Sequence, residues 1–225
     1  MSRPALLAVA HGSRNPAAAD VIGALARQIR RLAPMLDVRV AFIGHAEPSL
    51  PAQLGAAGSN AVVVPLLLSS GYHLATDISG AASSAGALVA GPLGPDELLL
   101  TALTARLAEA GVPDGTPVVL AAAGSSDPVA ADDVRKQADL LAERLGVPVL
   151  GAFATASSPT VPEAVSELRE RTGKPVAVAS YLLAPGYFQD QLSESSADWV
   201  TEPLGDHPAL AGLVIDRYRT AAKAS

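Results

Sequence analysis

Three polar side chains that could bind a metal ion or move a proton each follow an apolar segment of the chain. His11 comes directly after the apolar residues 6–10, Glu47 follows residues 37–44, and His73 follows residues 60–68. Two imidazoles and one carboxylate suit a divalent first-row metal such as Fe²⁺, Co²⁺, Ni²⁺ or Zn²⁺. Mg²⁺ and Ca²⁺ prefer sites made only of oxygen ligands. The spacing is unlike that of a compact zinc motif, so a site requires a fold that brings these segments together.

The first of these segments carries the strongest local signal. Residues 6–10 predict a short buried strand of a parallel sheet, and His11, Gly12, Ser13 and Arg14 form a tight turn after it. Asn15 then suits the N-cap of a helix, with proline at the first helical position. An imidazole, a hydroxyl and a guanidinium therefore lie at the carboxyl end of a strand, where open α/β sheets bind their ligands. The alternative is a histidine that only satisfies its own loop.

The rest of the first half alternates between strands and helices. Residues 37–44 and 60–68 predict two further strands, and residues 69–73 form the exit turn of the second of these. Helical spacing or helix-start residues predict helices over residues 16–32, 48–57 and 98–110, and a further helix that follows the exit turn and runs through Asp77 towards Leu88. Residues 111–117 are the most linker-like segment of the chain.

The second half repeats the first at a nearly constant offset of 111 to 115 residues. Four segments of the first half have equivalents in the second. They are AHGSRNP and AAGSSDP, AFIGHAEPSLP and AFATASSPTVP, LLLSSGYH and YLLAPGYF, and GPLG and EPLG. Such a match indicates internal duplication. We therefore expect an α/β fold of two duplicated βα halves, each with a parallel sheet flanked by helices, and a cleft between the halves. The expected domains are residues 1–112 and 113–225, with residues 111–117 crossing between them.

The three polar side chains are missing from the second half, although the residues around them are kept. Ala123 stands in place of His11, Ser158 in place of Glu47, and Phe188 in place of His73. Independent drift after the duplication could also produce this pattern. We interpret it as one metal site per chain, carried by residues 1–112, with the degenerate half 113–225 forming the opposite wall.

Composition excludes several classes of protein. The net charge is −6 and the sequence pI is about 5.1, which argues against a general nucleic-acid binder. The chain has no cysteine, so it has no disulfide and no thiolate metal site. The apolar run near the start is too short for a signal peptide, and the longest apolar run elsewhere is broken by Pro65, so we expect a cytoplasmic protein without a membrane partner. No GxxxxGK, GxGxxG or GxSxG motif is present.

The motifs HGSR, AEPSL and SGYHLATDI together resemble those of the sirohydrochlorin chelatases, the class II tetrapyrrole chelatases of the SirB/CbiX type, in their fused two-half form. The resemblance implies a lyase that inserts Fe²⁺ or Co²⁺, with Ni²⁺ as a further alternative, into sirohydrochlorin. The reaction needs no ATP and belongs to siroheme or cobalamin biosynthesis. It assigns the metal to His11 and His73, with Glu47 as the acidic residue of the middle motif. Without cysteine or a histidine-rich tail, neither an iron–sulfur cluster nor a metal-storage tail is expected.

The resemblance also gives each residue a chemical role. A neutral imidazole can hold a metal and later take up a proton, while Glu47 is either the proton acceptor or a third ligand. The substrate is a polyanion, so cationic side chains must face it. Arg14 is the first candidate, and Arg135 and Lys136 are further candidates. The expected macrocycle-binding residues are Ser13, Arg14, Gly71, Tyr72 and Phe188, although Phe188 could equally fill the core.

Two other functions remain open from the sequence. One is a metal chaperone, or a protein that binds a tetrapyrrole without metallating it. The other is an enzyme resembling the histidine phosphatases, but Ala10 precedes His11 where those enzymes have arginine. We expect a monomer, because the two halves are already fused. The sequence leaves open which metal is used and whether the macrocycle is strictly sirohydrochlorin.

Overall fold

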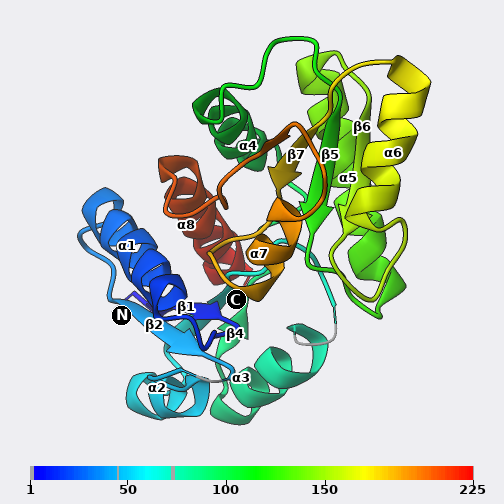
Figure 1. Ribbon diagram of the computed structural model, residues 1–225. Coiled ribbons are helices and arrows are strands. Elements are labelled where there is room, and N and C mark those ends of the chain that lie inside the picture. The colour runs from blue at the N-terminus through cyan, green and yellow to red at the C-terminus, as the bar shows by residue number, and fades with distance from the viewer. Residues whose placement is uncertain (1–2, 45, 72–73, 225) are drawn as a thin grey trace. The chain divides into compact units, whose positions relative to one another are not determined.

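The computed structural model describes residues 3–44, 46–71 and 74–224, and the chain forms two compact units (Figure 1). The first unit contains Met1–Leu93 together with Asp206–Ser225, and the second contains Gly94–Gly205. Among the described helices, none is both long enough and apolar enough to cross a membrane.

The first unit is built on a parallel sheet with the strand order β2-β1-β3-β4. The register pairs Leu6 of β1 with Val38 of β2 on one side and with Val62 of β3 on the other. The strands are β1 (Ala5–Ala10), β2 (Val38–Phe42), β3 (Ala61–Pro65) and β4 (Leu88–Val89). The helices are α1 (Pro16–Leu32), α2 (Leu50–Ala57), α3 (Ser79–Ala85) and α8 (Pro208–Lys223), and a π-helical turn spans Leu74–Ile78.

Local sequence explains where α1 begins. The side chain of Asn15 accepts a hydrogen bond from the backbone N–H of Ala17 at 3.0 Å, and proline occupies the first helical position, as predicted. The buried face of the helix carries Ile22, Leu25 and Ile29, spaced to lie on one side. This face packs α1 against α8, while α2 and α3 cover the other face of the sheet (Figure 1).

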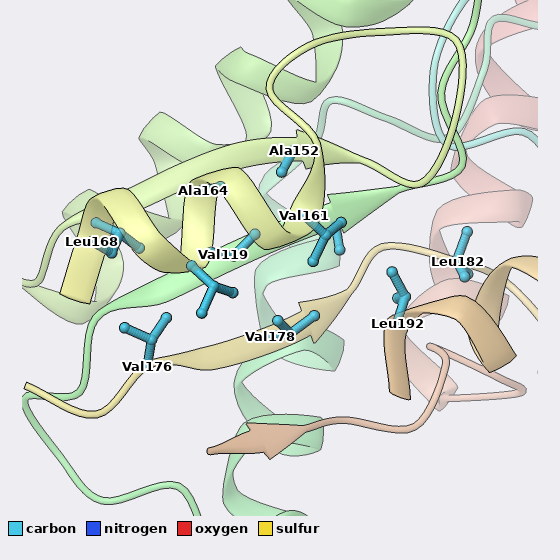
Figure 2. Packing of buried hydrophobic residues seen from close by; sticks show 11 residues of the cluster. Val119, Ala152, Val161, Ala164, Leu168, Val176, Val178, Leu182 and Leu192 are labelled. Carbon is cyan, nitrogen blue, oxygen red and sulfur yellow. The ribbon is translucent and has the colours of Figure 1, made fainter. Parts of the chain in front are cut away.

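The second unit repeats this plan with the strand order β6-β5-β7-β8, again parallel throughout. Its strands are β5 (Val118–Ala122), β6 (Val149–Phe153), β7 (Ala177–Ser180) and β8 (Trp199–Val200). Its helices are α4 (Glu97–Glu109), α5 (Pro128–Leu145), α6 (Val161–Thr172) and α7 (Tyr187–Ser193). Figure 2 shows Val119 and Val178 of the sheet packed against Val161 and Leu168 of α6.

The predicted fold class is confirmed, with two differences in detail. Each sheet gains a fourth strand of only two residues, β4 or β8, which is too short to show a periodic pattern. The second helix begins at Leu50 rather than at Pro48, because the chain is still extended there. Phe42 and Ser49 form a parallel bridge, in which the N–H of Phe42 donates to the carbonyl of Pro48 at 3.0 Å.

The two compact units of the structure do not coincide with the expected halves 1–112 and 113–225. Helix α4 packs on α5 and β7 of the second unit, and α8 packs on α1 and β3 of the first, so the two repeats exchange their closing helices. The chain therefore passes between the units at Leu93–Gly94 and at Gly205–Asp206, and residues 111–117 lie inside the second unit. The reason is that α4 buries Leu99, Leu103 and Leu107, which cover the second sheet.

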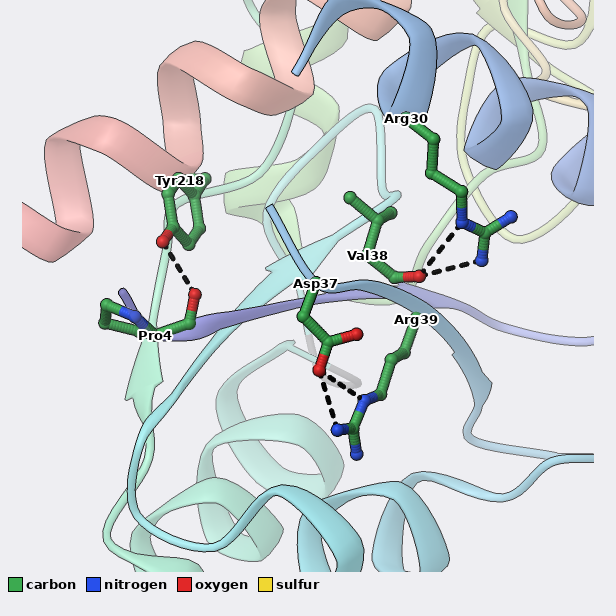
Figure 3. A network of polar contacts seen from close by, with 6 residues as sticks. All are labelled: Pro4, Arg30, Asp37, Val38, Arg39 and Tyr218. Carbon is green, nitrogen blue, oxygen red and sulfur yellow. Dashed lines mark hydrogen bonds and ion pairs between the residues drawn. The ribbon is translucent and has the colours of Figure 1, made fainter. Parts of the chain in front are cut away.

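A polar network closes the amino-terminal edge of the first sheet (Figure 3). The guanidinium of Arg30 donates two hydrogen bonds to the carbonyl of Val38, at 3.2 and 2.7 Å, and thereby ties α1 to β2. The hydroxyl of Tyr218 donates to the carbonyl of Pro4 at 2.7 Å and ties α8 to the start of β1. Burial raises the pKa of Tyr218 above its ordinary value, so this donor stays protonated. These bonds lie at the amino-terminal edge, so they do not cover the carboxyl-terminal edge of the sheet, where parallel sheets bind ligands.

Candidate functional site

The carboxyl-terminal edge of the first sheet brings the predicted site segments together. All four strands are parallel, so the chain leaves each of them at this same edge. Strand β1 lies between β2 and β3, and the chain goes from β1 to β2 and then back across to β3. The order reverses between β1 and β3, and open α/β sheets bind ligands at such a switch point. The turns that leave β1 and β3 flank this point.

The turn after β1 is bonded directly to the turn after β2. The N–H of Ile43 donates to the carbonyl of Ala10 at 3.1 Å, and the N–H of Gly44 donates to the carbonyl of His11 at 2.9 Å. Gly12 has a φ of +91°, and a Cβ atom on it would lie only 2.2 Å from the carbonyl oxygen of Gly44. Only glycine fits this approach, so the backbone of His11 is fixed beside the segment that leads to Glu47.

The side chains of the first turn divide between structural and accessible positions. The hydroxyl oxygen of Ser13 accepts a hydrogen bond from the N–H of Asn15 at 3.1 Å, which shapes the turn that starts α1. His11 and Arg14 are exposed. An exposed imidazole and guanidinium at a sheet switch point are both accessible to a dissolved ligand.

Glu47 lies at the rim of a surface hollow. One of its carboxylate oxygens, Oε2, accepts a hydrogen bond from the N–H of Ser49 at 2.7 Å, while the side chain remains exposed. The hollow has a volume of about 510 Å³, and Phe42, Ile43, Gly44, Ala46, Glu47, Ser49 and Pro51 line it. The backbone hydrogen bond holds the carboxylate in place and leaves it accessible to a proton or a metal ion.

The third predicted ligand is not tested by the structure. His73 and its neighbour Tyr72 lie outside the described residues. Gly71 is described: it is half-buried and has a φ of +149°, a region that favours glycine. Within residues 3–44, 46–71 and 74–224, no group of three histidine or acidic side chains lies close enough to hold a metal ion. The set of His11, Glu47 and His73 therefore stays a prediction.

The second unit builds the same pair of turns without the imidazole. Gly124 has a φ of +101°, and a Cβ atom on it would lie 1.7 Å from the carbonyl oxygen of Thr155. The N–H of Thr155 donates to the carbonyl of Ala123 at 2.9 Å, as Gly44 does to His11 in the first unit. The turn therefore forms with alanine in place of His11, which weakens the interpretation of that histidine as a loop filler.

Two hydroxyl side chains of the second unit donate hydrogen bonds at positions where the residues of the first unit have no side-chain donor. Thr155 donates its hydroxyl to the carbonyl of Ala123 at 3.0 Å, and Ser157 donates its hydroxyl to the carbonyl of Ser125 at 2.6 Å. The equivalent residues of the first unit are Gly44 and Ala46, which have no hydroxyl. The difference is visible in the sequence, because both residues lie inside the repeated motif AFIGHAEPSLP and AFATASSPTVP.

Phe188 is a surface residue, so the alternative that it fills the core is wrong. It is 38% exposed, and the adjacent Tyr187 is 68% exposed. Their rings form an edge-to-face pair with centroids 5.5 Å apart and an interplanar angle of 65°. The pair stands at the start of α7, directly after Gly186, which has a φ of +152°. The position thus offers an accessible aromatic surface in the second unit.

Comparison with known proteins identifies the two repeats. The model of the CbiX family matches residues 5–110 and, a second time, residues 117–221. The chain belongs to the CbiX family. This confirms the resemblance found in the motifs, and each CbiX repeat contains the turns described above.

Some related proteins match nearly the whole chain, and others match about half of it. The sirohydrochlorin ferrochelatase of Priestia megaterium is 28% identical over 241 residues, covering 96% of this chain and 90% of that protein. The sirohydrochlorin cobaltochelatase of Methanosarcina acetivorans is 32% identical over 123 residues, covering 47% of this chain and 95% of that protein. The second relative therefore matches a single repeat.

Solved structures show the same architecture. SirB from Bacillus subtilis with Fe³⁺ has a TM-score of 0.81 at 29% identity, covering 99% of this chain and 97% of that one. SirB from Bacillus subtilis subspecies spizizenii in complex with cobalt has a TM-score of 0.78 at 25% identity, covering 98% of this chain and 96% of that one. Both matches extend over both repeats, so the duplicated parallel sheets are those of a chelatase.

Proposed function

We propose that this chain is a chelatase that inserts Fe²⁺ or Co²⁺ into sirohydrochlorin without ATP. The observation that carries the proposal is the similarity to the Priestia megaterium ferrochelatase along nearly the whole chain, with both repeats matched by the family model. The named relatives include a ferrochelatase and a cobaltochelatase, and the similar structures contain Fe³⁺ or cobalt. The products lead to siroheme or to cobalamin.

In this proposal the metal is a substrate that His11 and His73 hold before insertion. Insertion joins the divalent metal to the four ring nitrogens and releases the two pyrrole N–H protons. A neutral imidazole can bind the metal and can accept a proton once the metal has left it. The carboxylate of Glu47 is exposed and held by the N–H of Ser49, so it is suited either to accept the second proton or to act as a third ligand.

The proposed macrocycle-binding residues are those that the resemblance implies. The substrate carries several carboxylates, and the exposed guanidinium of Arg14 is suited to bind one of them. The hydroxyl of Ser13 can still donate its proton while its oxygen accepts from Asn15. The proposal also includes Gly71, Tyr72 and Phe188, and the exposed ring of Phe188 supports its inclusion.

The two repeats have unequal roles in this proposal. The first repeat carries the metal-binding side chains, and the second keeps the turns without them. Because one chain already contains two repeats, whereas the Methanosarcina acetivorans relative matches one, we further propose that this chain acts as a monomer. Sedimentation of the protein at micromolar concentration tests the last point.

A turnover assay tests the proposed function. Sub-stoichiometric protein is mixed with sirohydrochlorin and excess Fe²⁺, Co²⁺ or Ni²⁺ under anaerobic conditions, and loss of the free-macrocycle absorbance is followed. We expect many turnovers for the parent protein and a loss of most of the rate for His11→Ala. The matched control is His207→Asn, which removes an imidazole from the N-cap of α8 but keeps a side chain that can cap the helix. Saturation after one equivalent would instead indicate a carrier of metal or tetrapyrrole.

A further inference from the structure

Two adjacent aromatic rings are exposed on the second unit, although aromatic residues make up only 4% of the sequence. Tyr187 is 68% exposed and Phe188 is 38% exposed. The other described phenylalanines and tyrosines are buried: Phe42, Phe153, Tyr181 and Tyr218. Single exposed apolar residues are common, but neighbouring aromatic rings on a surface indicate a contact with a ligand or a partner.

The aromatic pair lies at the edge of the second sheet that corresponds to the candidate site of the first. Strand β7 ends at Ser180 and α7 begins at Tyr187, so the chain reaches the pair from the carboxyl-terminal edge of the sheet. Open α/β sheets bind their ligands at this edge. The pair therefore stands where the fold presents residues to ligands.

Gln189 ties the first turn of α7 to the sheet. Its side-chain oxygen accepts a hydrogen bond from the hydroxyl of Ser180 at 2.6 Å, and its side-chain nitrogen donates to the carbonyl of Thr201 at 2.9 Å. Ser180 ends β7 and Thr201 follows β8, and both are buried. The N–H of Ser180 donates to the hydroxyl of Thr201 at 2.9 Å, which closes the network. The turn that carries the two rings is thereby attached to both strands.

An apolar contact holds only the far end of α7. Leu192 is 1% exposed and packs into the core cluster shown in Figure 2. Helix α7 has seven residues, and an isolated helix of this length is not stable in water. Leu192 alone would therefore leave the first turn, with its two rings, able to fray. Gln189 supplies the attachment at that turn.

A second glutamine fixes the ring of Tyr187. The side-chain nitrogen of Gln191 donates to the hydroxyl oxygen of Tyr187 at 3.0 Å, from one turn further along α7. The ring of Tyr187 in turn makes the edge-to-face contact with Phe188. Side chains that are already ordered lose less conformational entropy when a ligand binds. The pair is therefore prepared for binding before a ligand arrives.

The first unit forms the equivalent edge without this polar network. In place of Ser180, Gln189 and Thr201 it has Pro65, Leu74 and Ala90. Thr201 is equivalent to Ala90, because the N–H of each donates to the third strand of its own sheet. The shared fold therefore does not need these polar side chains, which indicates that they serve the aromatic pair of the second unit.

We propose that Tyr187 and Phe188 form one surface that contacts the face of the macrocycle, and that Gln189 and Gln191 are positioning residues that hold its two rings. The inference rests on the proposed function for the identity of the ligand, a planar tetrapyrrole. The metal ligands proposed above belong to the first unit, so this surface should act on macrocycle binding and leave metal binding unchanged.

Titration of the full chain with sirohydrochlorin, in the absence of metal, tests the surface. Tyr187→Ala should raise the Kd at least about fivefold, the lower end of the range for stacking a planar base on one aromatic side chain. Tyr187→Phe keeps the ring and loses only the bond from Gln191, so it should raise the Kd less. The Co²⁺ affinity of both variants should match that of the parent. An unchanged Kd for Tyr187→Ala would overturn the proposed surface.

Fluorine NMR tests the positioning role. The full chain labelled with 4-fluorophenylalanine carries three fluorine atoms, on Phe42, Phe153 and Phe188. Gln189→Leu should move the Phe188 signal towards that of an unstructured ring, leave the Phe153 signal in place, and raise the Kd for sirohydrochlorin roughly twofold to tenfold. If this variant does not fold, Gln189→Glu keeps the acceptor for the Ser180 hydroxyl and loses only the donor, and the same readings apply.

The matched control is another glutamine of the second unit. Gln137→Leu removes two hydrogen bonds with the backbone of Asp96 from a fully buried position. It should lower stability and leave the Phe188 signal and the Kd for sirohydrochlorin unchanged. A Phe188 signal that is the same in the parent and in the Gln189 variants would overturn the positioning role.

The turnover assay separates this inference from the proposed function. If the parent turns over and Tyr187→Ala binds sirohydrochlorin equally well, the inference fails and the chelatase stands. If binding depends on Tyr187 but the parent shows no turnover, the aromatic surface stands as that of a tetrapyrrole carrier and the chelatase fails.

Discussion

Replacing Gly12 by alanine should damage the metal site through the backbone alone. The positive φ of +91° costs a side chain about 1–2 kcal/mol. The new Cβ atom would also lie 2.2 Å from the carbonyl oxygen of Gly44, so the two turns must separate. Separation breaks the hydrogen bond from Gly44 to His11, a net loss of about 0.5–1.5 kcal/mol. The sum is a destabilisation of about 1.5–3.5 kcal/mol and a fall in melting temperature of roughly 3–14 °C.

The equivalent change in the second unit is the matched control. Gly124→Ala introduces the same kind of clash, 1.7 Å from the carbonyl oxygen of Thr155, and should cost a similar amount of stability. Because Ala123 stands where the first unit has His11, this variant should leave Co²⁺ affinity unchanged, whereas Gly12→Ala should lower it at least tenfold. Calorimetry gives both quantities for the two proteins. Equal Co²⁺ affinity of Gly12→Ala and the parent, or an equal loss in the two variants, would refute the assignment of the site to the first turn.

Three further predictions follow from exposure, charge and metal chemistry. Phe188→Ala should lower the free energy of unfolding by well under the ~3–5 kcal/mol expected for a buried phenylalanine such as Phe153. Phe188→Ala should also raise KM for the macrocycle without changing metal affinity. Thermal melts and kinetics of Phe188→Ala and Phe153→Ala check this. Hydrogen bonds from the N–H of Val176 and from Arg169 lower the pKa of Asp198 below its ordinary value. The carboxylate therefore stabilises the second unit above the ordinary carboxyl range near pH 4, and this effect is lost as the pH falls through the lowered pKa. Asp198→Asn should have a lower melting temperature at pH 7, and its melting temperature should change less with pH in the acid range. Co²⁺ binding should weaken as the pH falls below about 6.5, because protonated imidazoles cannot coordinate a metal. His11→Ala should weaken this pH dependence in a titration, and His11→Ala combined with His73→Ala should remove it.

The strands, the repeat and the start of α1 could be predicted because their signals are local. A buried run, a turn glycine and a cap such as Asn15 act within a few residues of themselves. The exchange of α4 and α8 could not be predicted in this way. The apolar face of α4 specifies burial against a sheet, but its periodicity does not say which of two similar sheets receives it.

The candidate site could be predicted in part for a related reason. The segments that carry His11 and Glu47 were predicted correctly to meet at one edge of the sheet, because the carboxyl ends of parallel strands share an edge. The role of Ser13 in shaping its own turn was missed, since the sequence does not reveal which partner a hydroxyl chooses. The placement of His73 stays a prediction.

The duplication separates what the turn needs in order to fold from what it carries for chemistry. Both units keep a glycine at positive φ and the backbone bond across the two turns, so these features belong to the fold. The second unit then adds hydroxyl bonds from Thr155 and Ser157 to the carbonyls of the first turn. The first unit has Gly44 and Ala46 at those positions and carries an exposed imidazole instead. The lack of these two hydroxyl bonds fits a ligand-binding turn, because such turns belong to the less stable parts of a protein. Introducing Gly44→Thr into the first unit should therefore stabilise the turn and, if that freedom serves the site, slow metal insertion.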